Sequence, residues 1–242
     1  MTSVLVTGAN RGIGLGLVRE LLNDPSVATV IATVRDIDAA KDLTSIENSR
    51  LHVITCEVTD EKSVEAAVEK VAEIVDGKGL DVLINNAGIY RGLLLDGDVS
   101  KAVVMEQFEV NAFAPLLVGN KFLGLLKRAA ELKGSAQIAN ISSTLGALEY
   151  AMSQSTEKPK TVIYAMSKAA LNMLTRRQAF EYKEYKIRST VFTPGWVQTE
   201  MGAADMDSMV EESTGPLAKL ILSLTEEHNG EYYRYSGEKL PW

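Results

Sequence analysis

Tyr164 and Lys168 stand four residues apart in the run Tyr-Ala-Met-Ser-Lys, a spacing that places both side chains on one face of a helix. A phenol is a weak acid, with an unperturbed pKa of about 10. A fixed ammonium within about 4–6 Å favours the phenolate and lowers that pKa by roughly 1–3 units. Such a tyrosine could give a proton to a carbonyl oxygen or take one from an alcohol. Taken alone, however, the pair favours an ordinary half-exposed helical face.

A glycine-rich segment, Gly8–Gly14, makes a dinucleotide site plausible near the N-terminus. It follows Val4–Thr7, a short apolar run typical of a buried parallel strand, and precedes leucines and valines at helical spacing that continue to Pro25. Glycine lets backbone amides approach a pyrophosphate, and the helix N-terminus supplies a partial positive charge. A tight turn without a ligand is the alternative, and three glycines within seven residues make it the weaker interpretation.

The end of the second predicted strand, Val27–Thr33, bears on which dinucleotide would bind. Its tip should lie near the adenosine ribose, where an acidic residue selects NAD and an arginine selects the 2′-phosphate of NADP. Arg35 comes first, and Arg11 offers a second guanidinium, so the sequence favours NADP. We interpret Asp36 as the N-cap of a short helix starting at Ile37. If Asp36 reads the ribose instead, the cofactor is NAD and Arg35 is only a surface residue.

The rest of the chain alternates between strands and helices. Further strands are predicted at Leu51–Cys56, Asp81–Ile84, Gln137–Ile141, Ile187–Phe192 and Glu231–Ser236. Helices are predicted after Asp60, from Val99 to Leu132 with Asn111 in the middle, at Thr161–Lys183 and at Leu217–Leu224, with a mobile flap over Glu200–Ser213. This alternation predicts one Rossmann-type α/β domain over residues 1–242, with a doubly wound parallel sheet of about seven strands and helices on both faces.

The polar motifs recur at one kind of position in this fold. In open parallel sheets, ligands bind beyond the carboxyl ends of the strands. The motif residues at such ends are Gly8, Arg35, Glu57, Asn86, Ser143 and Pro194. Unrelated surface features would scatter over both edges of the sheet, so their common placement predicts a single site.

Together these residues give the chain a resemblance to the short-chain dehydrogenase/reductase family over nearly its whole length. The matching segments are Thr7–Gly14, Asn85–Gly88, Asn111, Ser143, Tyr164 with Lys168, and Pro194–Thr199. Within the family the chain is most similar to the carbonyl-reductase branch that includes the sniffer and C-factor proteins. The resemblance implies an NADPH-dependent oxidoreductase that reduces small aldehydes, ketones or quinones. It also implies a homodimer or homotetramer, paired through the helices around Asn111–Leu126 and Thr161–Phe180.

The resemblance implies catalytic roles for four residues. Tyr164 would be the acid/base, and Lys168 would lower its pKa and hold the nicotinamide ribose. Ser143, rather than Ser142, would by analogy hydrogen-bond the substrate oxygen. Asn111 would hold a water that links Lys168 to solvent.

The resemblance also implies a set of residues that bind the dinucleotide. The pyrophosphate would lie on Gly8, Asn10, Arg11, Gly12, Ile13 and Gly14, and Arg35 would bind the 2′-phosphate. The adenosine and nicotinamide portions would contact Glu57, Val58, Asn86, Ala87, Gly88, Pro194, Gly195, Val197 and Thr199. Two features depart from the family pattern. Glu57 stands where aspartate is usual, and the segment Thr144–Lys160 is long, so it either folds over the substrate or forms a solvated loop.

Composition excludes several other classes of protein. The 242 residues are 46% hydrophobic and 24% charged, as in a soluble globular protein, and the formal net charge of −7 argues against nucleic acid or an anionic membrane as partner. Cys56 is the only cysteine, and the chain has no apolar run near the ~20 residues of a membrane span, so we expect a cytoplasmic protein. Neither His52 nor His228 has metal-ligand spacing, so no metal is expected.

Two other functions remain open at this stage. A non-catalytic NADP-binding sensor would use the same pocket to engage a protein partner, and an NAD-dependent alcohol dehydrogenase would read the ribose with Asp36. The substrate is not identified by the sequence. Six apolar residues either line a substrate pocket or belong to the core or the flap: Leu93, Leu94, Met152, Trp196, Met201 and Met206.

Overall fold

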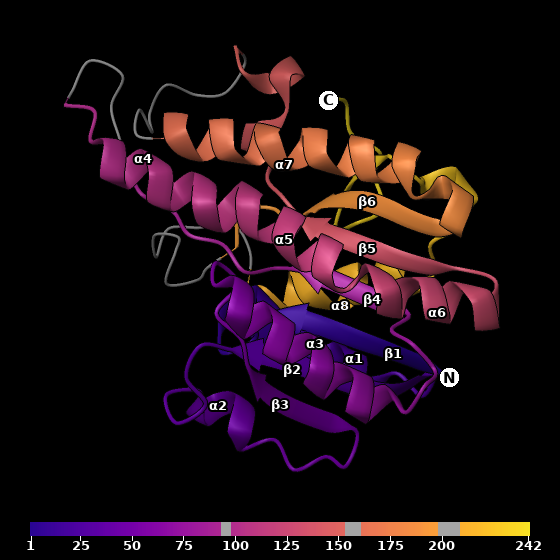
Figure 1. The fold of residues 1–242 in the computed structure, drawn as a ribbon. Coiled ribbons are helices and arrows are strands. Elements are labelled where there is room, and N and C mark those ends of the chain that lie inside the picture. The colour runs from indigo at the N-terminus through magenta and orange to yellow at the C-terminus, as the bar shows by residue number, and fades with distance from the viewer. Residues whose placement is uncertain (93–97, 153–160, 198–208) are drawn as a thin grey trace.

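The centre of the structure is a seven-stranded parallel sheet with the strand order β3-β2-β1-β4-β5-β6-β7 (Figure 1). The computed structural model describes residues 1–92, 98–152, 161–197 and 209–242. The strands are β1 (Thr2–Thr7), β2 (Val27–Val34), β3 (Leu51–Thr55), β4 (Val82–Asn85), β5 (Ala136–Ile141), β6 (Ile187–Thr193) and β7 (Tyr232–Arg234). Every neighbouring pair runs parallel, so the predicted Rossmann-type sheet is confirmed.

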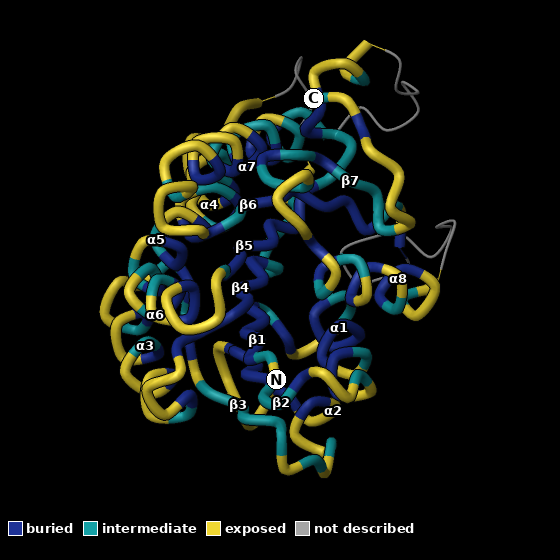
Figure 2. Tube along the Cα trace, turned by 90° about the vertical axis from the view of Figure 1, so that its right-hand side faces the viewer, coloured by how far each residue is buried: buried dark blue, intermediate teal, exposed yellow. Residues whose placement is uncertain are grey.

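Helices cover both faces of this sheet. Their bounds are α1 (Gly12–Asn23), α2 (Lys41–Thr44), α3 (Glu61–Val75), α4 (Lys101–Phe108), α5 (Ala114–Lys121), α6 (Leu123–Lys133), α7 (Val162–Glu181) and α8 (Val210–Leu222). Figure 2 shows α1, α2 and α8 on one side of the sheet and α3, α5, α6 and α7 on the other. The sheet is therefore the middle layer of three, as expected for a doubly wound fold.

Burial on both faces explains why strands such as β1, β2 and β4 are apolar over most of their length. In β1, Val4 and Val6 pack into the cluster that includes α1 and α8, whereas Leu5 between them packs into the cluster that includes α3, α5 and α6. All three side chains are fully buried. Successive strand residues point to opposite faces of the sheet. Because helices cover both faces, apolar side chains are favoured at successive positions of such a strand.

Several boundaries differ from the sequence prediction. The carboxylate of Asp36 accepts hydrogen bonds from the backbone amides of Asp38 and Ala39, and this turn delays the start of α2 to Lys41. Helix α8 begins at Val210, so residues 210–213 of the expected flap are helical, whereas residues 200–208 lie outside the described residues. The predicted long helix from Val99 to Leu132 is divided into α4, a π-helical turn, α5 and α6. The helix expected after Asp60 is α3, and it is capped by Asp60, whose carboxylate lies 2.7 Å from the amide of Ser63.

Some apolar side chains stay exposed on the outer surface of α7 and α5, among them Met166, Met173, Phe180, Phe113 and Leu116. The structure contains one chain, so the predicted homodimer or homotetramer stays a prediction.

None of the helices within the described ranges combines the length and apolarity that crossing a membrane requires.

Candidate active site

The loop after β4 is bound to the glycine loop after β1. The side-chain amide of Asn86 donates to the carbonyl oxygens of Thr7 and Gly8, at 2.9 and 3.1 Å. The hydroxyl of Thr7 in turn accepts hydrogen bonds from the backbone amides of Asn86 and Ala87. Two neighbouring strand ends are thereby fixed side by side, which holds the predicted dinucleotide loop against the middle of the sheet.

The glycine loop leaves no room for side chains. A Cβ on Gly14 would lie 2.3 Å from the carbonyl oxygen of Gly8, and one on Gly8 would lie 2.9 Å from Cα of Ala87. Gly8 and Gly12 also adopt positive φ values of 64° and 52°, which favour glycine. Arg11 is the N-cap residue of helix α1, and its side chain does not accept a hydrogen bond from the first backbone amides of the helix. This bare backbone cradle fits a pyrophosphate.

The two cations proposed to select NADP lie at the expected edge. Arg35 directly follows β2 and is exposed, and no acidic side chain in the described ranges pairs with it. Arg11 is exposed at the start of α1. Asp36 is engaged by the backbone of its own turn, as described above. Arg35 therefore presents an exposed guanidinium at this strand end, whereas one carboxylate oxygen of Asp36 is bound by its own turn.

The residues expected at the adenine lie at the end of β3. Val58 is buried, whereas the carboxylate of Glu57 accepts hydrogen bonds from the backbone amide and the hydroxyl of Thr59, at 3.2 and 2.9 Å. The amide of Glu57 donates to the hydroxyl of Ser63 at the start of α3. The longer glutamate side chain therefore closes its own turn, and its contact with a nucleotide stays a prediction.

The predicted catalytic side chains of β5 and α7 meet at the same edge. The hydroxyl of Ser143 hydrogen-bonds the phenol of Tyr164. The ammonium of Lys168 lies 5.6 Å from the centre of the Tyr164 ring and donates to the carbonyl oxygen of Ile141 at 2.8 Å. Ser142 points elsewhere, because its hydroxyl donates to the side chain of Asn172 at 2.7 Å. Of the two serines, the one beside the phenol is Ser143.

The direction of the pKa shift at Tyr164 differs from the sequence prediction. The pKa of the Tyr164 phenol is raised to about 12. Burial is the largest cause of this rise, the nearby phenol of Tyr90 adds to it, and the hydrogen bond from Ser143 opposes it. Burial also lowers the pKa of Lys168 to about 8. The expectation that the pKa of Tyr164 lies below its ordinary value is therefore wrong for this structure, because the loss of water around the phenol outweighs the interactions that stabilise its anion. Tyr164 is a neutral acid at neutral pH.

Asn111 is fully buried in the π-helical turn Glu109–Phe113 between α4 and α5. Its side chain accepts from the amide of Ile89 and donates to the carbonyl of the same residue, each at 2.8 Å, and also donates to the hydroxyl of Ser167. These contacts join the β4 loop to α7. They give a physical reason for a polar residue inside the helical region, while the water-holding role of Asn111 stays a prediction.

The segment after β6 is described only in part. Pro194 accepts a hydrogen bond from the hydroxyl of Ser213 in α8 at 2.6 Å, Gly195 has a φ of 80°, and Val197 is buried. Thr199 lies outside the described residues, as do Leu93, Leu94, Met201 and Met206 among the proposed pocket residues. Trp196 is 49% exposed and Met152 is 97% exposed, so both lie at the surface and not in a core.

Tyr90 is a neighbour of the proton donor that the sequence analysis missed. Its ring contacts the ring of Tyr164 edge to face, with the centroids 5.5 Å apart and the planes at 78°. Its place two residues after Gly88, at the same strand end as Asn86, is the signal that could have identified it. Among the described residues, no cluster of three histidine, cysteine or acidic side chains is arranged to hold a metal ion.

Comparisons with known proteins agree with this geometry. The sequence model of the short chain dehydrogenase family matches residues 2–209. The solved structure of an NADPH-bound carbonyl reductase from chicken fatty liver is 39% identical, with a TM-score of 0.94 over 100% of this chain and 99% of its own. Carbonyl reductase Sniffer of D. melanogaster is 31% identical, with a TM-score of 0.93 over the full length of both chains. The C-signal protein of Myxococcus xanthus is 33% identical over 67% of this chain and 93% of its own length.

The close approach at Gly14 predicts a large cost for a small substitution. In Gly14→Ala the new methyl group would meet a backbone carbonyl at 2.3 Å, so we expect a loss of about 1–3 kcal/mol in the free energy of unfolding. The matched control is Gly124→Ala in α6, where no atom lies within 4 Å of the added carbon. Denaturant unfolding measures both variants, and equal stability of the two would contradict the described packing of the loop.

The buried ammonium predicts a pH-dependent stability. Because the pKa of Lys168 is about 8 in the native state and 10.5 ordinarily, the native state binds fewer protons than the unfolded state between these values, and stability rises with pH. The full effect is on the order of 3 kcal/mol. In Lys168→Met this rise is absent. Subtracting the unfolding free energies of the variant from those of the wild type at pH 7.5 to 10.5 isolates the effect, and parallel curves would show that the lysine is not buried as described.

Proposed function

This chain belongs to the short-chain dehydrogenase family, as its motifs predict, and we propose that it reduces small aldehydes, ketones or quinones with NADPH. The observation that supports this proposal best is the hydrogen bond between Ser143 and Tyr164 with Lys168 buried beside them. This set can hold a carbonyl oxygen and protonate it as charge develops there.

The residues of this chain would share the reaction as follows. The Ser143 hydroxyl and the Tyr164 phenol both hydrogen-bond the substrate oxygen and so fix its position. When bound, the reduced nicotinamide supplies a hydride to the carbonyl carbon. The Tyr164 phenol gives its proton to the oxygen that becomes an alkoxide. With a pKa raised to about 12, Tyr164 still carries this proton at neutral pH and is a stronger acid than an alcohol.

Lys168 would support this transfer from below the phenol. Its ammonium is buried, donates to the carbonyl of Ile141 at 2.8 Å and lies 5.6 Å from the centre of the Tyr164 ring, so a positive charge sits beside the side chain that becomes a phenolate. In a site from which water is excluded, such a charge stabilises the anion more than it would in water. The pKa of about 8 means that Lys168 carries its charge at neutral pH.

The proposal of NADPH as cofactor rests on the edge formed by Arg11 and Arg35. A guanidinium binds phosphate with two hydrogen bonds in a plane, and the carboxylate of Asp36 is turned into its own backbone. The carbonyl reductase from chicken fatty liver is described as NADPH-bound, and a short-chain dehydrogenase/reductase structure from Burkholderia multivorans, 26% identical, as having bound NADP.

Replacing the proposed proton donor tests the reaction. Tyr164→Phe keeps the ring but removes the proton, so we expect the kcat for reduction of a panel of aldehydes, ketones and quinones to fall by at least 100-fold. NADPH affinity, measured by fluorescence, should change little. Tyr185→Phe, at an exposed position, is the control. Tight NADPH binding by a wild type that turns over no substrate in the panel would favour the sensor hypothesis instead.

Replacing the proposed phosphate ligand tests the choice of cofactor. Because Arg35 would contact the 2′-phosphate alone, Arg35→Ala should weaken NADPH binding by about 10-fold or more and leave NADH binding nearly unchanged. Arg19→Ala, an equal change of charge at an exposed position of α1, is the control. Equal losses for NADPH and NADH on calorimetric titration would exclude this role for Arg35.

A further inference from the structure

The β4 loop runs from the dinucleotide cradle to the proton donor. Ala87 lies against Gly8, and Gly88 lies between Asn111 and the ammonium of Lys168, since a Cβ there would be 3.3 and 3.6 Å from their side-chain atoms. Two residues later, the ring of Tyr90 contacts the ring of Tyr164. The loop thus passes Lys168 and reaches the ring of Tyr164.

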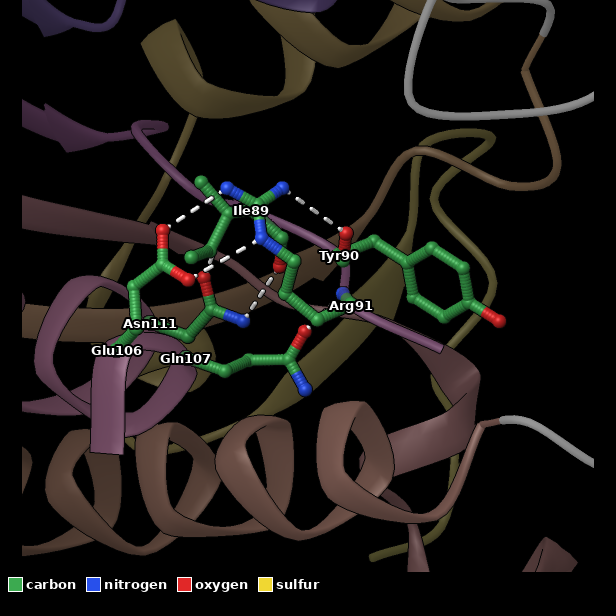
Figure 3. A network of polar contacts seen from close by, with 6 residues as sticks. All are labelled: Ile89, Tyr90, Arg91, Glu106, Gln107 and Asn111. Carbon is green, nitrogen blue, oxygen red and sulfur yellow. Dashed lines mark hydrogen bonds and ion pairs between the residues drawn. The ribbon is translucent and has the colours of Figure 1, made fainter. Parts of the chain in front are cut away.

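Three contacts fix the backbone on both sides of Tyr90 (Figure 3). Ile89 is clamped through its amide and its carbonyl by Asn111. The amide of Arg91 donates to the side chain of Gln107, which is fully buried one helical turn before Asn111. The guanidinium of Arg91 pairs with Glu106 at 2.9 Å. Figure 3 shows the Tyr90 ring directed away from these contacts.

Residues on one stretch of α4 and the π-helical turn therefore hold the backbone on both sides of one aromatic ring. A backbone held at residues 89 and 91 leaves Tyr90 little freedom except rotation of its own side chain. The edge-to-face contact with Tyr164 then stabilises one orientation. The ring is only half-buried.

We propose that Tyr90 is a specificity-determining residue whose ring forms a wall of the substrate site and favours carbonyl compounds that carry an aromatic ring next to the carbonyl group. The inference rests on the proposed function, because the carbonyl oxygen is placed by Ser143 and Tyr164. A flat ring attached to that carbonyl would lie within reach of Tyr90, where an edge-to-face or offset contact is favourable. A saturated ring of similar size lacks this contact. Gln107 is a positioning residue that acts through the backbone of Arg91.

The experiment compares kcat/KM for benzaldehyde and cyclohexanecarboxaldehyde, with NADPH, in wild type and variants. Intrinsic reactivity differs between the two aldehydes but cancels when the aryl-to-alkyl ratio of a variant is divided by that of the wild type. Tyr90→Leu should lower this ratio about three- to tenfold, mainly through KM for benzaldehyde. Tyr90→Phe, which keeps the ring, should change it less than twofold. Tyr185→Leu, far from the site, is the matched control and should leave it unchanged.

Gln107→Met supplies a second test that leaves Tyr90 in place. The variant keeps the volume of the side chain but removes the acceptor for the Arg91 amide, so the ratio should fall in the same direction as in Tyr90→Leu. A loss of stability alone would lower both rates together and leave the ratio unchanged.

The outcomes distinguish failure of the proposed function from failure of the proposed role of Tyr90. If the wild type reduces neither aldehyde nor any other carbonyl compound, the proposed function is wrong and this inference falls with it. If the wild type reduces both aldehydes and the ratio is the same in Tyr90→Leu, the proposed function stands and the role of Tyr90 is excluded.

Discussion

The burial of Lys168 and the partial burial of the Tyr164 phenol are the constraint on which the rest of the site depends. Burial keeps the phenol protonated, with a pKa raised to about 12, and the hydroxyl of Ser143 only partly offsets this effect. The same burial lowers the pKa of Lys168 to about 8. A neutral acid beside a buried cation is suited to giving up a proton at the moment when a strongly basic oxygen forms. Carbonyl reduction requires such a step, whereas alcohol oxidation requires the phenolate.

Holding these groups in place requires a polar face on α7 where a core helix would normally be apolar. Ser142 is bound to Asn172, whose amide donates to the carbonyl of Gly146, so the turn after β5 is fixed to the helix. Further along α7, Thr175 and Gln178 both accept hydrogen bonds from Asn140 of β5. Buried polar groups that satisfy one another specify one register of the helix on the sheet, because any shift would leave them unpaired. The position of Tyr164 and Lys168 of α7 relative to Ser143 follows from that register.

Much of the fold could be predicted from the sequence, and the reasons are local. Apolar runs such as Val4–Thr7 that end at glycine or asparagine mark parallel strands covered on both faces, and each was found within one or two residues at most ends. The placement of the motifs at one edge follows from the parallel topology. The starts of α2 and α8 were not predicted in this way, since Asp36 closes a turn before α2, and the Glu212 carboxylate accepts a hydrogen bond from the amide of Met209 at the start of α8.

The electrostatics and the neighbours of the site could not be predicted from spacing. The four-residue separation of Tyr164 and Lys168 indicated correctly that they share a site, but the direction of the pKa shift depends on how much water the fold removes. Likewise, the position of Tyr90 after Gly88 places it at the right strand end, but nothing in the sequence indicates that its ring contacts Tyr164 or that Gln107 holds the backbone beside it. The measurement that tests the central claim most directly is the pH titration of the Tyr164 phenol by NMR of protein labelled with carbon-13 at tyrosine Cζ, assigned by its loss in Tyr164→Phe. The account predicts a phenol that stays neutral beyond pH 10, above the ordinary tyrosine range. A phenolate that forms below pH 9 in the free protein would contradict it.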